Sequence, residues 1–355
     1  MRVLLIGEYS GFFTNLKKGL EAIGVECILA SNSDSWKQIR GSNIRLFDDS
    51  KTSGIKRIKN MVFDPYKRRS ELYGFDVVQF VNPIVYSQIV NTIMFKTIKK
   101  HNKKVFVSIA GDGFSVFKAY LDGAFRYYIY DDNPMLCKKY KGFRGLVNKI
   151  NERYVLNHSN GIIPIMYEYA VGVRNRNNTL PTIPIPFDCS EIEYKPNRVI
   201  DGKIVIFHGI IREITKGSGY IIEALRIIEE RYHDEVTVII DGKKPLTEYL
   251  KSLYNINILV DQCKENCYGM NAIYAMAEGR IVLGGASSES LREIGVSESP
   301  IIHIEPNVDQ IVSQIESIIK KKNLLEELGL KSRKYVEEVH NHKIIAKKYI
   351  DAWNI

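Results

Sequence analysis

The chain has 355 residues, of which 45% are hydrophobic and 26% are charged, the composition of an ordinary globular protein long enough for two domains. This composition argues against collagen, coiled coil and intrinsic disorder. No run of 18 or more apolar residues occurs, and the apolar N-terminus, residues 1–6, is too short for a signal peptide, so we expect a cytoplasmic protein. Five cysteines without a C-x-x-C pair favour neither a disulfide framework nor a zinc site. We interpret Cys263 and Cys267 as two buried thiols.

Positive charge is concentrated in the first half of the chain. Residues 1–190 carry 28 Lys and Arg against 16 Asp and Glu, a net charge of +12, whereas residues 191–355 carry 22 against 25. The densest basic segment, residues 51–69, also contains five apolar side chains, which suits an anionic membrane surface. A solvated helix face explains the same pattern. No nucleic-acid partner is predicted, because the chain has no zinc finger, RNP motif or arginine-rich tract.

The first thirty residues predict a β-α-β unit. Residues 2–6 are apolar, residues 7–11 form a glycine-containing loop, Leu16, Leu20 and Ile23 recur at helical spacing, and residues 25–30 suit the next strand. The alternation continues with strands at residues 77–81 and 104–109 around a helix at 86–101, then strands at 161–165 and 182–185. The long aromatic segments 36–73 and 114–145 have no clear pattern and could form an acceptor surface.

A second alternating series follows a cluster of prolines, Pro184, Pro186 and Pro196, that is typical of a linker. Strands are expected at residues 203–207, 236–240, 256–260, 280–283 and 300–304, and helices at 219–230, 246–253 and 270–277. Residues 308–353 are largely helical in pattern. We therefore predict two doubly wound α/β domains, residues 1–190 and 191–335, and a C-terminal helix in residues 336–355 that packs back on the first domain.

Two stretches could carry chemistry. Residues 208–219 leave an apolar strand, contain glycines and enter an amphipathic helix, so that helix amides together with Arg212 and Lys216 could hold a diphosphate. A surface loop with two solvated cations is the alternative, and the Walker A pattern is absent. His208 either contacts a nucleotide or is structural. In residues 260–285 a glycine loop leads into a helix of small residues that ends at Gly279, and by itself this is only a β-α-β unit.

In this order, about fifty residues apart, the two stretches resemble GT-B glycosyltransferases, particularly the family-four type of bacterial capsule, O-antigen and exopolysaccharide assembly. Lys216 followed by glycine matches the family's basic glycine loop. Residues 268–269 and 275–279 match the family's E-x-F-G-x-x-x-x-E-A-M-A-x-G element. Residues 75–80 and 183–188 are also similar to the family, so the resemblance covers the whole chain. Asn266 and Tyr274 stand where that element has glutamates. The usual Gly-Arg reads Gly209-Ile210, with an arginine following at Arg212.

The resemblance implies a GT-B fold, with two Rossmann-like domains facing across a cleft, and a retaining glycosyltransferase that needs neither metal nor other cofactor. It would move a sugar from a nucleotide-sugar donor to a glycan or lipid-linked acceptor, at the inner face of the cell membrane. Arg212 and Lys216 would stabilise the departing diphosphate. Asp112 would bind or deprotonate the acceptor hydroxyl, unless it only forms a turn. The implied donor-binding residues are Gly11, His208, Gly209, Gly217, Asn266, Tyr268, Gly269, Met270, Asn271 and Tyr274.

Two other functions remain open. The absence of both motif glutamates also suits a non-catalytic GT-B-like subunit that binds a glycan or a partner glycosyltransferase. A GT-B sugar-nucleotide epimerase is a third hypothesis, although no full acid and base set is evident. No D-x-D triplet occurs, which argues against a metal-dependent glycosyltransferase of the GT-A type. The nucleotide base, the sugar and the acceptor are not predicted.

Overall fold

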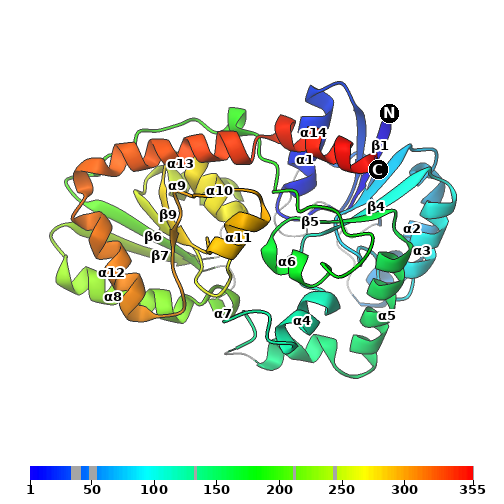
Figure 1. The fold of residues 1–355 in the computed structure, drawn as a ribbon, viewed down its shortest axis with the longest axis horizontal. Coiled ribbons are helices and arrows are strands. Elements are labelled where there is room, and N and C mark those ends of the chain that lie inside the picture. The colour runs from blue at the N-terminus through cyan, green and yellow to red at the C-terminus, as the bar shows by residue number, and fades with distance from the viewer. Residues whose placement is uncertain (33–40, 48–53, 132–133, 211–212, 243–245, 355) are drawn as a thin grey trace. The chain divides into compact units, whose positions relative to one another are not determined.

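The computed structural model describes residues 1–32, 41–47, 54–131, 134–210, 213–242 and 246–354. They form two compact units, shown in Figure 1. Unit 1 comprises Met1–Ala124, Cys137–Pro186 and His342–Ile355, and unit 2 comprises Phe125–Leu136 and Phe187–Asn341. The boundaries between the two units, at residues 186/187 and 341/342, lie a few residues from the predicted domain boundaries. The short segment 125–136, from the first half of the chain, belongs to unit 2.

Unit 1 is built on a parallel five-stranded sheet with the order β2-β1-β3-β4-β5. Its strands are apolar on both faces, because helices cover both sides of a doubly wound sheet. The strands are β1 (Arg2–Ile6), β2 (Glu26–Ala30), β3 (Val77–Phe80), β4 (Lys104–Ile109) and β5 (Gly161–Pro164). The α-helices are α1 (Phe12–Ala22), α2 (Ile55–Lys67), α3 (Asn91–Lys100), α4 (Phe114–Leu121), α5 (Gly142–His158), α6 (Tyr167–Val171) and α14 (His342–Trp353).

The C-terminal helix α14 is part of the core of unit 1. It packs along α1, where Gly19 permits the approach, since a Cβ there would lie 2.2 Å from the carbonyl oxygen of His342. The indole of Trp353 is buried and its Nε1 donates to Gln79 Oε1 over 2.9 Å. Lys104 Nζ donates to the carbonyl oxygen of Trp353, also over 2.9 Å. The last helix therefore stabilises the β-sheet formed by the first half of the chain.

Unit 2 repeats the plan with the order β10-β9-β8-β6-β7, again all parallel. Its strands are β6 (Ile204–Ile210), β7 (Val236–Gly242), β8 (Ile258–Val260), β9 (Ile281–Gly284) and β10 (Ile302–His303). Its α-helices are α7 (Glu213–Lys216), α8 (Ser218–Arg231), α9 (Leu246–Tyr254), α10 (Met270–Ala277), α11 (Ser288–Glu293), α12 (Val308–Ile319) and α13 (Leu325–Val339). Helices α8 and α12 lie side by side and share one apolar core with the strands (Figure 1).

Each sheet has a point where the strand order reverses direction. In unit 1 this point lies between β1 and β3, and in unit 2 it lies between β6 and β8. Loops that leave the two strands there turn to opposite faces, and the gap between them is where doubly wound sheets bind ligands. The predicted loop at residues 7–11 follows β1, and the predicted stretches 208–219 and 260–285 begin at the carboxyl ends of β6 and β8. The topology therefore places all three at such reversal points.

Most predicted elements are present with boundaries shifted by a few residues, but the strand predicted at residues 182–185 is wrong. These residues are not part of either sheet, although Ile183 N donates to the carbonyl oxygen of Pro164 over 3.0 Å. Pro184 interrupts this segment and Pro181 and Pro186 flank it, so that N–H donors that a strand needs are missing. The helix predicted over residues 86–101 begins only at Asn91. There the side-chain oxygen of Asn91 accepts from the preceding turn.

Three further expectations concern the surface and the cysteines. Of the basic segment, residues 51–53 lie outside the described residues, and α2 begins at Ile55. No helix within the described ranges combines the length and the hydropathy required to cross a membrane. The five cysteines all lie in the described ranges and none forms a disulfide, and the prediction that Cys263 and Cys267 are buried thiols is confirmed.

Candidate functional site

His208 joins the carboxyl end of β6 to a neighbouring strand and helix. The ring is fully buried, with Nδ1 2.7 Å from the carbonyl oxygen of Val260 and Nε2 2.8 Å from Ser218 Oγ. A carbonyl can only accept, so Nδ1 carries the proton and Nε2 accepts from the serine hydroxyl. Burial lowers the pKa of His208 to about 4. The imidazole is therefore neutral near pH 7, and both its nitrogens have partners inside unit 2.

Lys216 forms a buried ion pair with Asp261. Its Nζ lies 2.5 Å from Asp261 Oδ1, and the two side chains are only 10% and 1% exposed. Lys216 ends α7 after β6, and Asp261 directly follows β8, so the pair bridges the reversal point of unit 2. Asn271 Nδ2 lies 3.4 Å from the same Oδ1, while Asp261 Oδ2 is buried with no hydrogen-bond partner among the described residues. The predicted diphosphate lysine is thus paired with a carboxylate in this structure.

Gly217 forms the elbow between α7 and α8. Its φ of 72° lies in the left-handed region, which favours glycine. A Cβ at this position would also lie 2.5 Å from Cys263 Sγ. Cys263 N donates to the carbonyl oxygen of Lys216 over 3.0 Å, so the loop after β8 packs directly on this elbow. Both the backbone conformation and the close packing therefore require glycine.

Helices α8 and α10 start next to this pair without a capping side chain. Their N-cap residues are Gly217 and Gly269, and neither helix has an acidic residue in its first turn. The first amides of a helix have no partner within the helix, and the helix dipole makes that end positive. Nothing lies within 4 Å of a Cβ built on Gly269, so space is open there. The two ends together with Lys216 form a set of donors suited to an anion.

Other side chains that were predicted to bind the donor pack against neighbouring residues of unit 2. The Tyr268 hydroxyl is buried, 2.8 Å from Tyr335 Oη and 2.9 Å from His340 Nε2. The Tyr274 ring packs edge-on against Phe187, with the ring centroids 5.1 Å apart. Met270 is buried as well. The side chains of Tyr268 and Met270 therefore pack inside unit 2.

Backbone contacts fix the neighbouring loops. The carbonyl oxygen of Asn266 accepts from Ser287 N over 3.0 Å. A Cβ at Gly285 would lie 2.3 Å from the carbonyl oxygens of both Glu265 and Cys267, so the loops after β8 and β9 pack backbone to backbone. A Cβ at Gly209 would lie 3.4 Å from the ring of Tyr249, which is ordinary contact. The carboxyl edge of unit 2 is thus held by main-chain contacts as well as by side chains.

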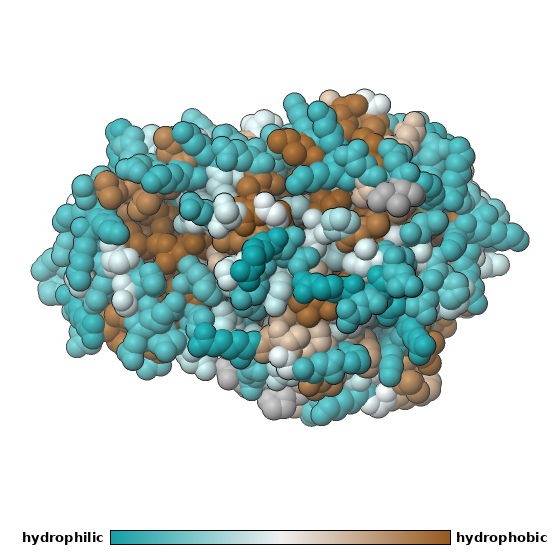
Figure 2. All heavy atoms as spheres, in the orientation of Figure 1, coloured by the Kyte–Doolittle hydropathy of each residue, from teal (hydrophilic) through white to brown (hydrophobic). Residues whose placement is uncertain are grey.

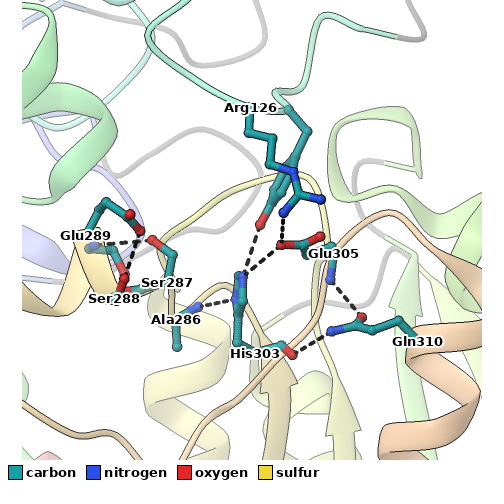
Figure 3. A network of polar contacts seen from close by, with 10 residues as sticks. Arg126, Ala286, Ser287, Ser288, Glu289, His303, Glu305 and Gln310 are labelled. Carbon is teal, nitrogen blue, oxygen red and sulfur yellow. Dashed lines mark hydrogen bonds and ion pairs between the residues drawn. The ribbon is translucent and has the colours of Figure 1, made fainter.

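Figure 3 shows a polar network at the end of β10, centred on His303. Ala286 N donates to His303 Nδ1 over 3.0 Å, so the hydrogen of the neutral ring is on Nε2. This atom lies 3.1 Å from Tyr127 Oη and 4.0 Å from Glu305 Oε1. Arg126 Nη1 lies 3.0 Å from the same Glu305 oxygen. These contacts attach the segment 125–136 to unit 2 and connect it with the loop after β9.

In unit 1 the starts of α1 and α4 are already filled by buried carboxylates. Glu8 Oε1 accepts from Gly11 N over 3.0 Å, and Glu8 Oε2 accepts from Thr14 N over 2.8 Å, at the start of α1. Glu152 accepts from Phe114 N and Ser115 N over 2.5 and 2.7 Å, at the start of α4. A phosphate at either end would meet a negative charge. An anion site therefore fits the helix starts of unit 2 better than the starts of α1 and α4.

Asp112 lies in the glycine turn after β4. A Cβ on the following residue, Gly113, would lie 2.7 Å from Glu152 Oε2, so the turn is pressed against that carboxylate. Asp112 Oδ2 is 3.9 Å from Lys139 Nζ, and its side chain is 18% exposed. The carboxylate thus keeps some access to solvent at the carboxyl edge of unit 1.

The structure brings some predicted residues together and separates others. Lys216 and Asn271 contact Asp261 and Gly217 follows Lys216 in the chain, whereas Gly11 and Asp112 belong to unit 1. Arg212 lies outside the described residues. Sequence reasoning missed Asp261, although its position directly after an apolar strand was a usable signal. Within the described part of the chain, no group of three or more His, Cys, Asp and Glu side chains could hold a metal ion.

Comparison with known proteins identifies the fold. No protein-family model and no curated sequence matches the chain. Among solved structures, sucrose-phosphate synthase from Thermosynechococcus elongatus matches with a TM-score of 0.64 at 14% identity, covering 100% of this chain and 98% of that one. Anabaena HepE in complex with UDP and glucose matches with a TM-score of 0.65 at 10% identity over 100% of both chains.

A putative UDP-N-acetylglucosamine 2-epimerase from Listeria monocytogenes also matches, with a TM-score of 0.55 at 9% identity over 99% of this chain and 95% of that one. A protein named as a synthase and one named as a putative epimerase thus share this architecture, so the fold by itself does not select the reaction. The two parallel five-stranded sheets with flanking helices, matched over the full chain, give this protein the GT-B fold.

Proposed function

We propose that this chain is a glycosyltransferase that transfers a sugar from a nucleotide-sugar donor to a glycan or lipid-linked acceptor in surface polysaccharide synthesis. The proposal includes a cytoplasmic location, a metal-independent reaction and retention of anomeric configuration. One observation carries it: in unit 2, two uncapped glycine-started helices and Lys216 meet where the strand order reverses. The solved complex of HepE with UDP and glucose supports the same ligand class.

Each group has a distinct part in this chemistry. Breaking the bond to the anomeric carbon leaves growing negative charge on the diphosphate. The amides at the starts of α8 and α10 and the ammonium of Lys216 would stabilise that charge, a contribution of about 3 to 4 kcal/mol for a well-placed donor. His208, neutral and bound to Ser218, would hold the start of α8 in place. Asp112 would bind the acceptor hydroxyl from unit 1.

The decisive experiment is a calorimetric titration with UDP, GDP and CMP. Lys216→Met should weaken binding of the preferred nucleotide at least tenfold, since it removes the cation but keeps a similar volume. Lys203→Met is the matched control, because Lys203 precedes β6 at the opposite end of the strand and donates to His233 O. A screen of nucleotide sugars for donor hydrolysis, with and without EDTA, then tests turnover and metal independence. Absence of nucleotide binding at millimolar concentration would refute the proposal.

A specific observation favours a second candidate, a non-catalytic GT-B-like subunit that binds a glycan or a partner glycosyltransferase. The charge of Lys216 is compensated by Asp261, and Tyr274 packs on Phe187 where the similar family has a glutamate. Both features reduce the number of charged and polar groups with which the site can bind a nucleotide. The two candidates differ in the same titration, because only the transferase requires nucleotide binding that depends on Lys216.

A further inference from the structure

Helix α5 of unit 1 presents an apolar stripe to solvent. Phe143, Leu146 and Ile150 recur at spacings of three and four residues and are 83%, 51% and 58% exposed. The opposite face of the helix carries the buried residues Val155 and Leu156. The stripe therefore points away from the core of the unit, which is unusual for three large side chains on one helix. Figure 2 shows brown, hydrophobic atoms at the surface at the lower right, where Figure 1 places α5.

Helix α3 extends this surface. Thr92 Oγ1 donates to Asn151 Oδ1 over 2.6 Å, and Gln88 Nε2 donates to Asn148 Oδ1 over 2.5 Å, so the start of α3 lies against the middle of α5. Two further exposed apolar side chains, Ile89 and Ile93, alternate with these polar contacts along residues 88–93. The apolar surface thus spans two helices that are held together by side-chain hydrogen bonds.

The exposed charges of α3 and α5 have one sign. The two helices carry six cations and α5 is preceded by a seventh, all exposed: Lys96, Lys99, Lys100, Lys141, Arg144, Lys149 and Arg153. Their one acidic residue, Glu152, is buried and caps α4. Lys149 follows Leu146 by three residues, and Arg153 follows Ile150 by three, so these cations border the stripe directly. Long basic side chains can bury their stems and keep their charges at a polar boundary.

We propose that the α3/α5 surface, defined by the stripe, Ile89, Ile93 and these seven cations, docks on the surface of a membrane that contains anionic lipids. Phosphate headgroups match the positive charge of the two helices, and the acyl boundary accepts the phenyl ring and the two aliphatic side chains. Nucleic acid would satisfy the cations but would leave the stripe in water. The surface lies on α3 and α5, and not on the basic segment 51–69 that the composition singled out.

The experiment is co-sedimentation of the full chain with vesicles of phosphatidylglycerol and phosphatidylethanolamine, compared with vesicles of phosphatidylcholine alone. The variant Phe143→Ser/Leu146→Ser/Ile150→Ser should lower the partition coefficient on the anionic vesicles at least tenfold. The control variant Phe63→Ser/Tyr66→Ser changes exposed side chains of α2 and should stay within twofold of the wild type. Lys149→Gln/Arg153→Gln should lower binding about fivefold for each cation removed. Circular dichroism and thermal melting confirm that each variant is folded.

Three results would overturn the inference. The stripe variant could bind anionic vesicles as the wild type does, or the wild type could bind phosphatidylcholine equally well. Alternatively, light scattering could show a wild-type dimer that the stripe variant dissociates, which would make the surface a contact between copies of this chain. The assay contains no nucleotide, and Lys216→Met should bind the vesicles normally, so its outcome is independent of the proposed transferase activity.

Discussion

The ion pair between Lys216 and Asp261 makes a sharp prediction for the variant Asp261→Asn. The change keeps the shape of the side chain and an oxygen that can accept from Lys216, but it removes the negative charge. The lysine, whose side chain is only 10% exposed, is then left without its counter-charge. We expect a less stable unit 2 and, in the same protein, tighter binding of a nucleoside diphosphate, because the ligand can now provide that counter-charge.

The size of both effects follows from the burial of the pair. Removing one partner of a buried ion pair costs about 3 to 5 kcal/mol in the free energy of unfolding. Lys216 keeps slight access to water and a neutral acceptor, so we expect about 3 kcal/mol. For a domain of this size that corresponds to a melting temperature about 6 to 12 °C lower. A gain of about 1.4 kcal/mol in diphosphate binding would be a tenfold tighter dissociation constant.

The assay is differential scanning calorimetry at several UDP concentrations, since a ligand that binds only the native state raises the melting temperature. Glu235→Gln is the matched control. It removes the carboxylate of an exposed pair in the same unit, in which Lys322 Nζ lies 3.1 Å from Glu235 Oε2 and both side chains are about half exposed. A surface pair of this kind contributes less than about 1 kcal/mol.

The double variant Lys216→Met/Asp261→Asn tests the reasoning independently. It leaves no buried charge, so it should be more stable than Lys216→Met alone, which leaves Asp261 buried and unpaired. If Asp261→Asn melts within 2 °C of the wild type, the pair does not contribute the stability that its burial indicates. If Asp261→Asn binds UDP more weakly than the wild type, Asp261 does not compete with a diphosphate, and the assignment of Lys216 to the leaving group must be abandoned.

Three more predictions concern single residues of unit 2. Gly217→Ala should lower the free energy of unfolding by about 2 kcal/mol or more, because φ is 72° and the new methyl group would meet Cys263 Sγ. The control Gly219→Ala has open space around the new methyl group inside α8, so it should be neutral or stabilising. Urea unfolding measures the free energy for both variants. Burial raises the pKa of Glu278 from 4.5 to about 7. The protonated carboxyl group therefore contributes fully to the free energy of unfolding below pH 4.5, and this contribution, about 3 kcal/mol, is lost as the pH rises through 7. Glu278→Gln should abolish that loss in melting curves recorded from pH 5 to 8. The pKa of His208 falls from 6.5 to about 4, so the wild type should lose stability as pH drops below 6.5, and His208→Gln should not show this loss.

Much of the fold could be predicted because its signals are local. The apolar runs that became β1 and β4 were placed with the observed boundaries, and the helix predicted at residues 270–277 is α10. Alternation of such runs with helical periodicity is sufficient for two doubly wound units. The strand predicted at residues 182–185 failed for a local reason as well, since an apolar run interrupted by prolines cannot provide the donors of a sheet.

The candidate site could be predicted only in part. The sequence places the loops after β6 and β8 at the carboxyl edge, and it predicts helices from residues 219 and 270, close to the observed N-caps Gly217 and Gly269. It gives no sign that Asp261 neutralises Lys216, 45 residues away. It also gives no sign that Glu152 caps a helix that begins 38 residues earlier. Asp261 and Glu152 each decide whether a nearby positive group remains available to a ligand.

The sequence alone therefore determined the class of fold, the approximate limits of its strands and helices and the loops that can hold an anion. Only the tertiary structure decided which charges are already paired, which helix ends are already filled and which apolar side chains stay exposed on α5. The physical reason is that periodicity and backbone preference act between neighbouring residues, whereas an ion pair, a side-chain cap or an exposed stripe depends on which distant segments the packed chain brings into contact.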